Sequence, residues 1–147
     1  MFIGLFLTAC APIYCQSYKC KPADADDRTR GAENEWVVSK KSQRSRFVRG
    51  SVGDLNGGTL TPALVEVFDK PAYLLTDAFT RPPKNQKRLF ACWTNDGGRF
   101  SFTKLKPGRY ELRVSYSRDL LTEHYYLTIG AKRSWGRALD VFLTVPI

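Results

Sequence analysis

The chain has 147 residues and a mass of 16.7 kDa, enough for one domain with its own core and too little for two. Hydrophobic residues make up 43% and aromatic residues 13% of it, which excludes an intrinsically disordered protein. A formal net charge of +9 either favours anionic partners or only keeps the surface solvated, and without a nucleic-acid-binding motif we expect no nucleic-acid partner.

The first ten residues, MFIGLFLTAC, are apolar and uncharged, and they end in Leu7-Thr8-Ala9-Cys10. This tetrapeptide resembles the lipobox of bacterial lipoproteins, in which small residues precede a cysteine whose thiol receives diacylglycerol. No Lys or Arg precedes the apolar stretch, and the stretch is short for a signal peptide. We therefore expect a truncated lipoprotein signal at residues 1–10 with Cys10 as the lipid attachment site. An ordinary secretion signal and a chance match stay open.

Three further cysteines, Cys15, Cys20 and Cys92, suit an exported protein, because disulfides persist in oxidising compartments. Three thiols allow one disulfide and leave one cysteine over, so the pairing stays open. Cys15 and Cys20 have four residues between them, and no second pair or histidine cluster completes a tetrahedral site. We expect no metal and no cofactor.

Residues 11–43 contain two prolines, the acidic run DADD and the start of the basic run KKSQRSR (residues 40–46), and they show no sustained periodicity. This composition is typical of a flexible tether, in which only Trp36, Val37 and Val38 suggest a short docked strand. The folded domain is expected to span residues 44–147.

From Phe47 onward the sequence alternates with the period of two that half-buried strands show. The expected strands are RFVRGSVGD, TPALVEVFD, RLFACWT, RFSF, RYELRVSY, EHYYLTIG and ALDVFLTV. A long connection at residues 69–87 separates the second strand from the third, and its role stays open. Short strands with turn residues at their joints are typical of an antiparallel β-sandwich. The expected core residues are Phe47, Val48, Val52, Val65, Val67, Phe100, Phe102, Tyr110, Leu112, Val114, Leu127, Ile129, Leu139, Val141 and Leu143.

Two turns carry residues that constrain the backbone. Asp96 and Gly98 lie in the NDGG turn, and Pro107 and Gly108 lie in KPGR. Proline fixes φ at the second position of a type II turn, and glycine supplies a positive φ at the third. Gly98 and Gly108 are therefore expected to resist substitution, because a β-carbon penalises positive φ. We interpret these residues as structural.

Four patterns lie between about residues 46 and 145: Gly50-x-Val52 with Asp54 and Gly57, Ala63-x-Val65, Thr94-x-Asp96-x-Gly98-x-Phe100, and Leu105-x-Pro107-Gly108-x-Tyr110. Together they resemble the carboxypeptidase regulatory-like domains. The resemblance implies an all-β, seven-stranded antiparallel Greek-key β-sandwich of the transthyretin-like (prealbumin-like) type. It also implies a non-catalytic accessory module common in bacterial envelope proteins. The insertion at residues 69–87 departs from the family pattern.

Enzymatic chemistry is not expected. The hydrolases and iron dioxygenases on similar sandwiches use two or more histidines, and this chain has only His124. No G-x-S-x-G elbow is present, so a catalytic triad has no sequence support. We interpret His124 as structural and expect no small-molecule substrate.

Two functional hypotheses follow. The first is a lipid-anchored or secreted module of the outer membrane or periplasm that gives structural support or binds an envelope protein. The second is carbohydrate binding, because exposed aromatic rings stack on sugars. Its candidate residues are Trp93, Trp135, Tyr73, Tyr125 and Tyr126. Cys92 and Trp93 are expected on opposite faces of one strand, so only one of them faces the core.

Overall fold

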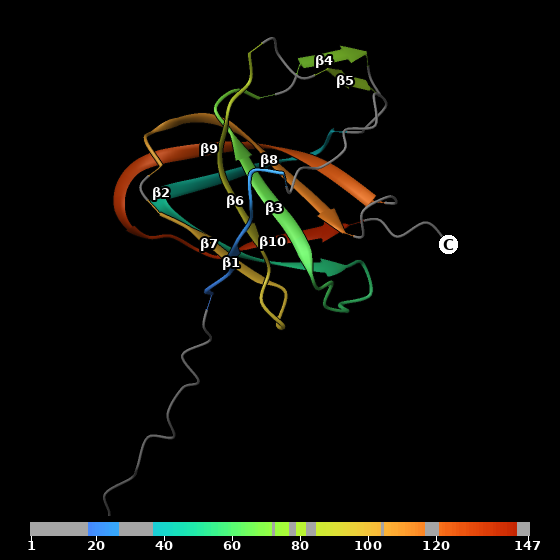
Figure 1. Ribbon diagram of the computed structural model, residues 1–147. Helices are drawn as coiled ribbons and strands as arrows, with labels where there is room; N and C mark the ends of the chain where they lie inside the picture. Colours follow the sequence, from blue (N-terminus) through green and yellow to red (C-terminus); the bar gives the residue numbers. More distant parts are fainter. Residues whose placement is uncertain are drawn as a thin grey trace, which may run out of the picture.

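The computed structural model is built from strands (Figure 1). It describes residues 18–26, 37–71, 73–76, 79–81, 85–103, 105–116 and 121–143. The strands are β1 (Lys21–Pro22), β2 (Val37–Asp54), β3 (Ala63–Phe68), β4 (Tyr73–Thr76), β5 (Phe79–Arg81), β6 (Arg88–Trp93), β7 (Arg99–Phe102), β8 (Gly108–Tyr116), β9 (Leu121–Trp135) and β10 (Leu139–Leu143). Within these residues there is no helix, so the all-β prediction is confirmed.

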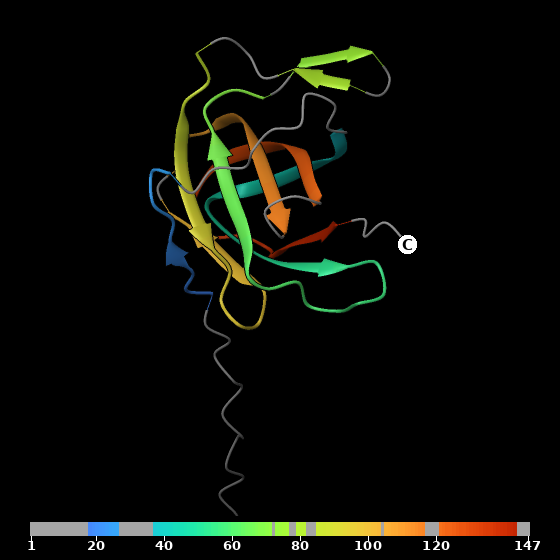
Figure 2. The same cartoon turned by 45° about the vertical axis from the view of Figure 1, so that its right-hand side comes forward.

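The main sheet has the strand order β1-β6-β3-β8-β9-β2-β10, with β7 paired to β2. It curls around the core, so that its two ends approach each other (Figures 1 and 2). β2 pairs in parallel with both β9 and β10, whereas the other pairs are antiparallel. The expectation of a wholly antiparallel sheet is therefore wrong, because alternation within a strand does not specify the direction of its neighbour.

β2 is long enough to pair with strands on both sides of the core. Its first part lies beside β9, and its last residues lie between β7 and β10. The register with β9 shifts between Gln43 and Ser45 and again between Ser45 and Phe47. Such bulges bend and twist a strand. Opposite this bend, a β-carbon on Gly130 would lie 2.8 Å from the carbonyl oxygen of Arg44, so only glycine permits this approach.

Every expected core residue except the half-buried Phe47 is buried. The core also takes Leu60, Ala63, Cys92, Leu105 and Tyr125, and its side chains come from strands on both sides of the curled sheet. Cys92 is 4% exposed and faces this core, whereas its neighbour Trp93 is only partly buried on the opposite face.

The predicted tether differs from the structure in two places. β2 begins at Val37, so the expected domain start at residue 44 lies inside a strand. Further towards the N-terminus, β1 pairs with β6, which places residues 18–26 on the domain (Figure 2). Residues 40–43 lack apolar alternation, which predicts a tether, yet they pair along β9.

Two turns are held by the same pattern of side-chain to backbone hydrogen bonds. Asp54 Oδ1 accepts hydrogen bonds from the backbone N–H groups of Asn56 (2.8 Å) and Gly58 (2.7 Å). Asn95 Oδ1 accepts the equivalent bonds from Gly97 and Arg99, both 3.0 Å. In each turn the glycine three positions after the Asp or Asn has a positive φ. These residues are Gly57 (86°) and Gly98 (66°).

The expected positive φ at Gly98 is thus confirmed. Its turn is held by Asn95, and Asp96 is exposed beside it. The prediction of a positive φ at Gly108 is wrong. Gly108 begins β8, has no positive φ, and a β-carbon there would lie 3.5 Å from the Tyr110 ring, an ordinary contact. Pro107 precedes it as an exposed residue just before the strand.

Within the insertion at residues 69–87, β4 and β5 form a separate two-stranded antiparallel sheet. It lies at the end of the molecule away from β7 (Figure 1). The backbone N–H of Asp69 donates to the carbonyl of Lys87 at 3.0 Å, so the insertion begins and ends at one point of the fold.

Candidate functional site

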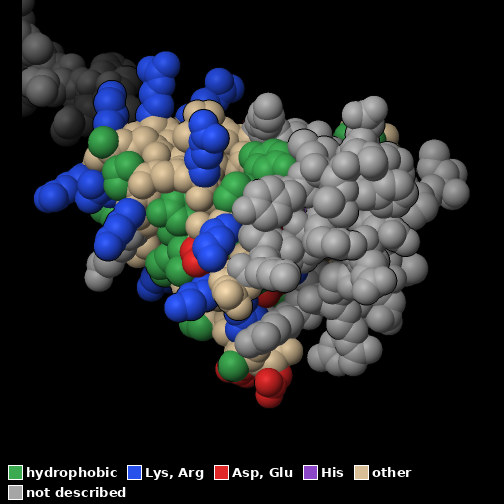
Figure 3. All heavy atoms as spheres, turned by 90° about the horizontal axis from the view of Figure 1, so that it is seen from above, with side chains coloured by type: hydrophobic (Ala, Val, Ile, Leu, Met, Phe, Trp, Pro, Cys, Tyr) green, Lys and Arg blue, Asp and Glu red, His purple; other side chains and the backbone are tan. Residues whose placement is uncertain are grey.

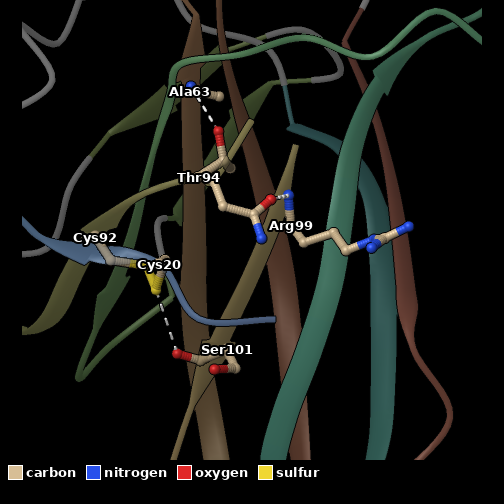
Figure 4. Close-up of a disulfide and its surroundings, with 7 residues drawn as sticks. Cys20, Ala63, Cys92, Thr94, Arg99 and Ser101 are labelled. Carbon is tan, nitrogen blue, oxygen red and sulfur yellow. Dashed lines mark hydrogen bonds between the residues drawn. A yellow bond between two sulfur atoms is a disulfide. The ribbon is translucent and has the colours of Figure 1, made fainter. Parts of the chain in front are cut away.

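A disulfide fixes the N-terminal segment to the domain. Cys20 is bonded to Cys92 of β6, 72 residues further along the chain, and their Cα atoms are 5.7 Å apart. The Cys20 sulfur also lies 3.6 Å from the carbonyl oxygen of Ser101 in β7 (Figure 4). The disulfide therefore occupies the place where β6 and β7 approach each other and closes that side of the core.

Residues 18–25 form a strap, which is our term for the segment that continues this attachment on both sides of Cys20. The Tyr18 ring lies against the guanidinium groups of Arg49 and Arg99, at 5.3 and 5.8 Å from its centroid. At the other end, the N–H of Ala23 donates to the carbonyl of Ala91 on β6 at 3.2 Å. Because the strap pairs with β6, it covers an edge that would otherwise present free backbone groups.

A buried charged cluster occupies the face of β3, β8 and β9 that points away from the apolar core. Its members are Glu66, Glu111, Arg113 and His124, all of which are buried. They share one face because Arg113 pairs with both Glu66 and His124 across neighbouring strands. Gln86 covers Glu111 on this face.

Glu111 is the centre of this cluster. Its Oε1 atom accepts hydrogen bonds from Arg113 Nε (3.0 Å) and Nη2 (2.9 Å), and it lies 2.5 Å from His124 Nδ1. Its other oxygen accepts from the Gln86 amide. Burial acts to raise the pKa of Glu111, but the hydrogen bond with His124, the charges of Arg113 and His124 and the Gln86 bond outweigh it. The pKa of Glu111 therefore lies below its ordinary value, and the carboxylate stays charged.

The cluster also ties covering segments to the sheet. Arg88 Nη1 donates to Glu66 Oε1 at 3.1 Å, and its Nη2 atom donates to the carbonyls of Asp24 (2.8 Å) and Ala25 (3.2 Å) in the strap. Arg113 lies 4.3 Å from the centroid of the Phe68 ring. Because Glu111 is held by internal donors on both oxygens, its chemistry is that of a structural ion network.

The aromatic candidates for sugar stacking do not form one platform. Tyr125 is 2% exposed, so its assignment to an exposed platform is wrong, because its ring packs in the core. Trp93 and Tyr126 are partly buried and lie on β6 and β9, with β3 and β8 between them. The side chains of Tyr73 and Trp135 lie outside the described part of the structure, as do Cys10 and Cys15.

The β10 edge is closed by side chains. Lys41 Nζ donates to the carbonyl of Asp140 at 2.7 Å, and the Tyr125 hydroxyl donates to the carbonyl of Phe142 at 2.9 Å. The same hydroxyl lies 2.6 Å from Glu123 Oε2, and burial together with this carboxylate raises the pKa of Tyr125. A surface cavity of about 360 Å³ lies beside this edge and includes Lys41 and Arg137 in its lining.

Sequence reasoning missed the charged cluster and Asn95. Glu66 between the apolar Val65 and Val67 was the available signal, since a carboxylate inside a buried strand needs a partner. The covering role of Gln86 had no signal, because it depends on how the insertion folds back.

No model of a known protein family, no curated protein and no solved structure matches this chain. In the residues that the structure describes, no group of three or more His, Cys, Asp or Glu side chains is arranged to hold a metal ion. Across the same part of the chain, no helix is long and apolar enough to cross a bilayer.

Proposed function

We propose that this chain is an exported, non-catalytic module of the cell envelope, anchored by lipid at Cys10 and acting in structural support or protein interaction. The observation that carries the proposal is the bond between Cys20 and Cys92. Structural disulfides persist in oxidising compartments, and this one stabilises the attachment of the N-terminal segment to the sheet.

The position of the strap fits an anchor. Tyr18 follows Cys10 by eight residues and already contacts the domain. Eight extended residues span at most about 28 Å, so a lipid on Cys10 would hold the domain close to the membrane surface. A non-catalytic role fits the charged cluster, in which Glu111 and Arg113 bind each other and Gln86 instead of facing an open site.

We also propose that the curled sheet is a variant of the Greek-key, prealbumin-like sandwich of the carboxypeptidase regulatory-like domains. Two observations support this relationship. Side chains from β7, β10 and the end of β2 pack against those from β3, β8 and β9 in one core. Gly98, which belongs to the family-like pattern, has the positive φ that its turn requires.

Carbohydrate binding is the weaker proposal. With Tyr125 in the core, Trp93 and Tyr126 remain as described candidates, and they lie on strands that are not neighbours. Two rings held apart in this way do not stack on one sugar ring together.

The test is the mass of the protein from the membrane fraction of a bacterial host, expressed with its native upstream region. We expect a chain that starts at Cys10 and carries diacylglycerol and acyl mass, with Cys20 and Cys92 resistant to alkylation until reduction. The matched variant Cys10→Ser should lose the lipid mass and leave the membrane. An unmodified cytoplasmic chain with both thiols free would disprove the proposal.

A further inference from the structure

An extended basic surface lies where β8, β9 and the first part of β2 run side by side. We call it the basic face. Arg109 on β8 pairs with Thr128 on β9, which pairs in turn with Ser42 on β2. Arg44 follows Ser42 by two residues and so shares its side of the strand. The members of the basic face are Arg44, Arg46, Lys106, Arg109, Lys132 and Arg133. Lys106 lies just before β8, and Lys132 and Arg133 lie in a part of β9 where residues 131–134 are all exposed.

The charges of the basic face are not neutralised by the described part of the protein. All of its members except the partly buried Arg46 are exposed, and none forms an ion pair with another described residue. The acidic residues nearest along these strands are occupied elsewhere, Glu111 by Arg113 and Glu123 by Tyr125. Viewed from above, Lys and Arg side chains crowd the left of the molecule with little acidic surface among them (Figure 3).

The chain reaches the domain beside the same strand. Continuing along β2 from Arg46, the next arginine is Arg49, whose guanidinium lies against the Tyr18 ring. The guanidinium of Arg99, on the neighbouring strand β7, also lies near the Tyr18 ring. The Nε atoms of Arg46 and Arg49 have no hydrogen-bond partner among the described residues. The positive charge therefore extends along β2 towards the point where the N-terminal segment meets the domain.

We propose that the basic face binds the phosphate groups of anionic phospholipids and so orients the domain against a membrane surface. This inference rests on the proposed envelope location. Four of its six members are arginines, whose planar guanidinium groups bind phosphate in a bidentate manner. The basic face is the outer side of paired strands, so it can contact an extended membrane surface. The cavity at β10 includes none of its members in its lining.

The lipid anchor would attach the domain to the membrane, and the basic face would set its orientation. A lipid anchor at the end of a segment does not fix the orientation of the domain, and a polybasic surface adds a second contact that is sensitive to salt. Tyr18 contacts Arg49 further along β2, so the N-terminal segment meets the domain on a strand that also contributes to the basic face.

The experiment is flotation of the full chain, carrying Cys10→Ser, with phosphatidylcholine vesicles that either contain or lack phosphatidylglycerol. The substitution removes the lipid, so binding measures the protein surface alone. We expect binding only with phosphatidylglycerol, weakened at physiological ionic strength. The triple variant Arg44→Gln, Arg109→Gln and Lys132→Gln should bind at least about tenfold more weakly.

The matched control is Lys21→Gln, Lys70→Gln and Lys87→Gln, which removes the same charge from exposed lysines outside the basic face. We expect a change below about threefold. Equal losses in both triple variants, or equal binding to both kinds of vesicle, would overturn the inference. So would a soluble acidic polysaccharide or single-stranded DNA that binds the basic face at physiological salt more tightly than the vesicles do.

The two proposals fail separately. An unlipidated Cys10 in cells removes the anchor without changing the vesicle result. A lipidated chain whose unlipidated form ignores phosphatidylglycerol keeps the anchor and removes the role of the basic face. Melting temperatures of both triple variants, expected near that of the parent chain, show that the substitutions leave the fold intact.

Discussion

Asn95 stands in the turn between β6 and β7 where Asp54 stands in the turn between β2 and β3, and each binds the N–H groups two and four residues ahead. The second turn also contacts the strand that leads into the first, because the N–H of Val52 on β2 donates to the carbonyl of Gly98 at 2.8 Å. The two turns, each of which needs a glycine with a positive φ, therefore lie at the same end of the sheet.

Gly98→Ala should destabilise the protein strongly. The residue has φ of 66°, and its new β-carbon would lie 2.6 Å from Thr59 Cγ2 and 2.7 Å from the Val52 carbonyl oxygen. We expect a loss of about 2–4 kcal/mol in the free energy of unfolding, from backbone strain and overpacking. The control is Gly97→Ala in the same turn, where the nearest atom would be 3.4 Å away. Denaturant unfolding of both variants measures the difference, and similar losses would refute the assigned geometry.

Removing the disulfide with Cys20→Ser and Cys92→Ser should lower stability by up to about 4 kcal/mol. The bond closes a loop with a sequence separation of 72, and loop closure of this size removes that much entropy from the unfolded chain. Thermal unfolding in the absence and presence of a reductant measures it. Reductant should lower the melting temperature of the parent chain and leave the double variant unchanged. A parent chain indifferent to reductant would show that the bond is not formed.

Low pH should reduce the free energy of unfolding through protonation of Glu111. Its pKa is lower in the folded chain than its ordinary value of 4.5, so the unfolded chain takes up the proton first as pH falls. The stabilisation is therefore complete above about pH 4.5 and is lost as pH falls through the folded pKa. Melting temperature measured against pH should decline less steeply for Glu111→Gln than for the parent chain.

At neutral pH the same variant should be less stable by about 3–5 kcal/mol, because Arg113 would be left buried without its carboxylate. Asp140→Asn, at an exposed position, is the control and should follow the parent curve. Parallel declines for Glu111→Gln and the parent chain would assign the acid sensitivity to other groups.

Tyr125→Phe should cost about 1–2 kcal/mol, because it leaves a backbone carbonyl of β10 and the Glu123 carboxylate without the hydroxyl. Tyr116→Phe makes the same chemical change at a partly buried tyrosine at the end of β8. We expect that control to lie within about 0.5 kcal/mol of the parent in chemical unfolding. Equal effects would mean that the Tyr125 hydroxyl does not hold the β10 edge.

Alternation predicted the strands well where one face meets the apolar core. β7 has the expected bounds, and β8 differs from its expected segment by one residue at the start. Alternation failed for the first part of β2, whose basic residues lie beside β9 without an apolar stripe. It also gave no strand direction, which left the parallel pairs of β2 unforeseen.

The candidate sites were harder to predict, because each depends on segments that fold back over the sheet. Alternation of Glu111 and Arg113 with apolar neighbours shows only that they share a face. Their burial depends on the packing of Gln86 from the insertion. The choice of Cys20 as the partner of Cys92 likewise depends on the path of the strap past β7. Gly108 was misassigned because KPGR has the composition of a type II turn, while its backbone has already entered β8.

The bond between Cys20 and Cys92 also sets how the domain would respond to mechanical tension. A pull on the N-terminal end would pass through the sulfur atoms directly into β6, and the residues enclosed between the two cysteines would bear no load. β1, which is only two residues long, would therefore not have to resist peeling. Once the contacts of Tyr18 yield, further extension would come from the part of the chain that follows Cys92.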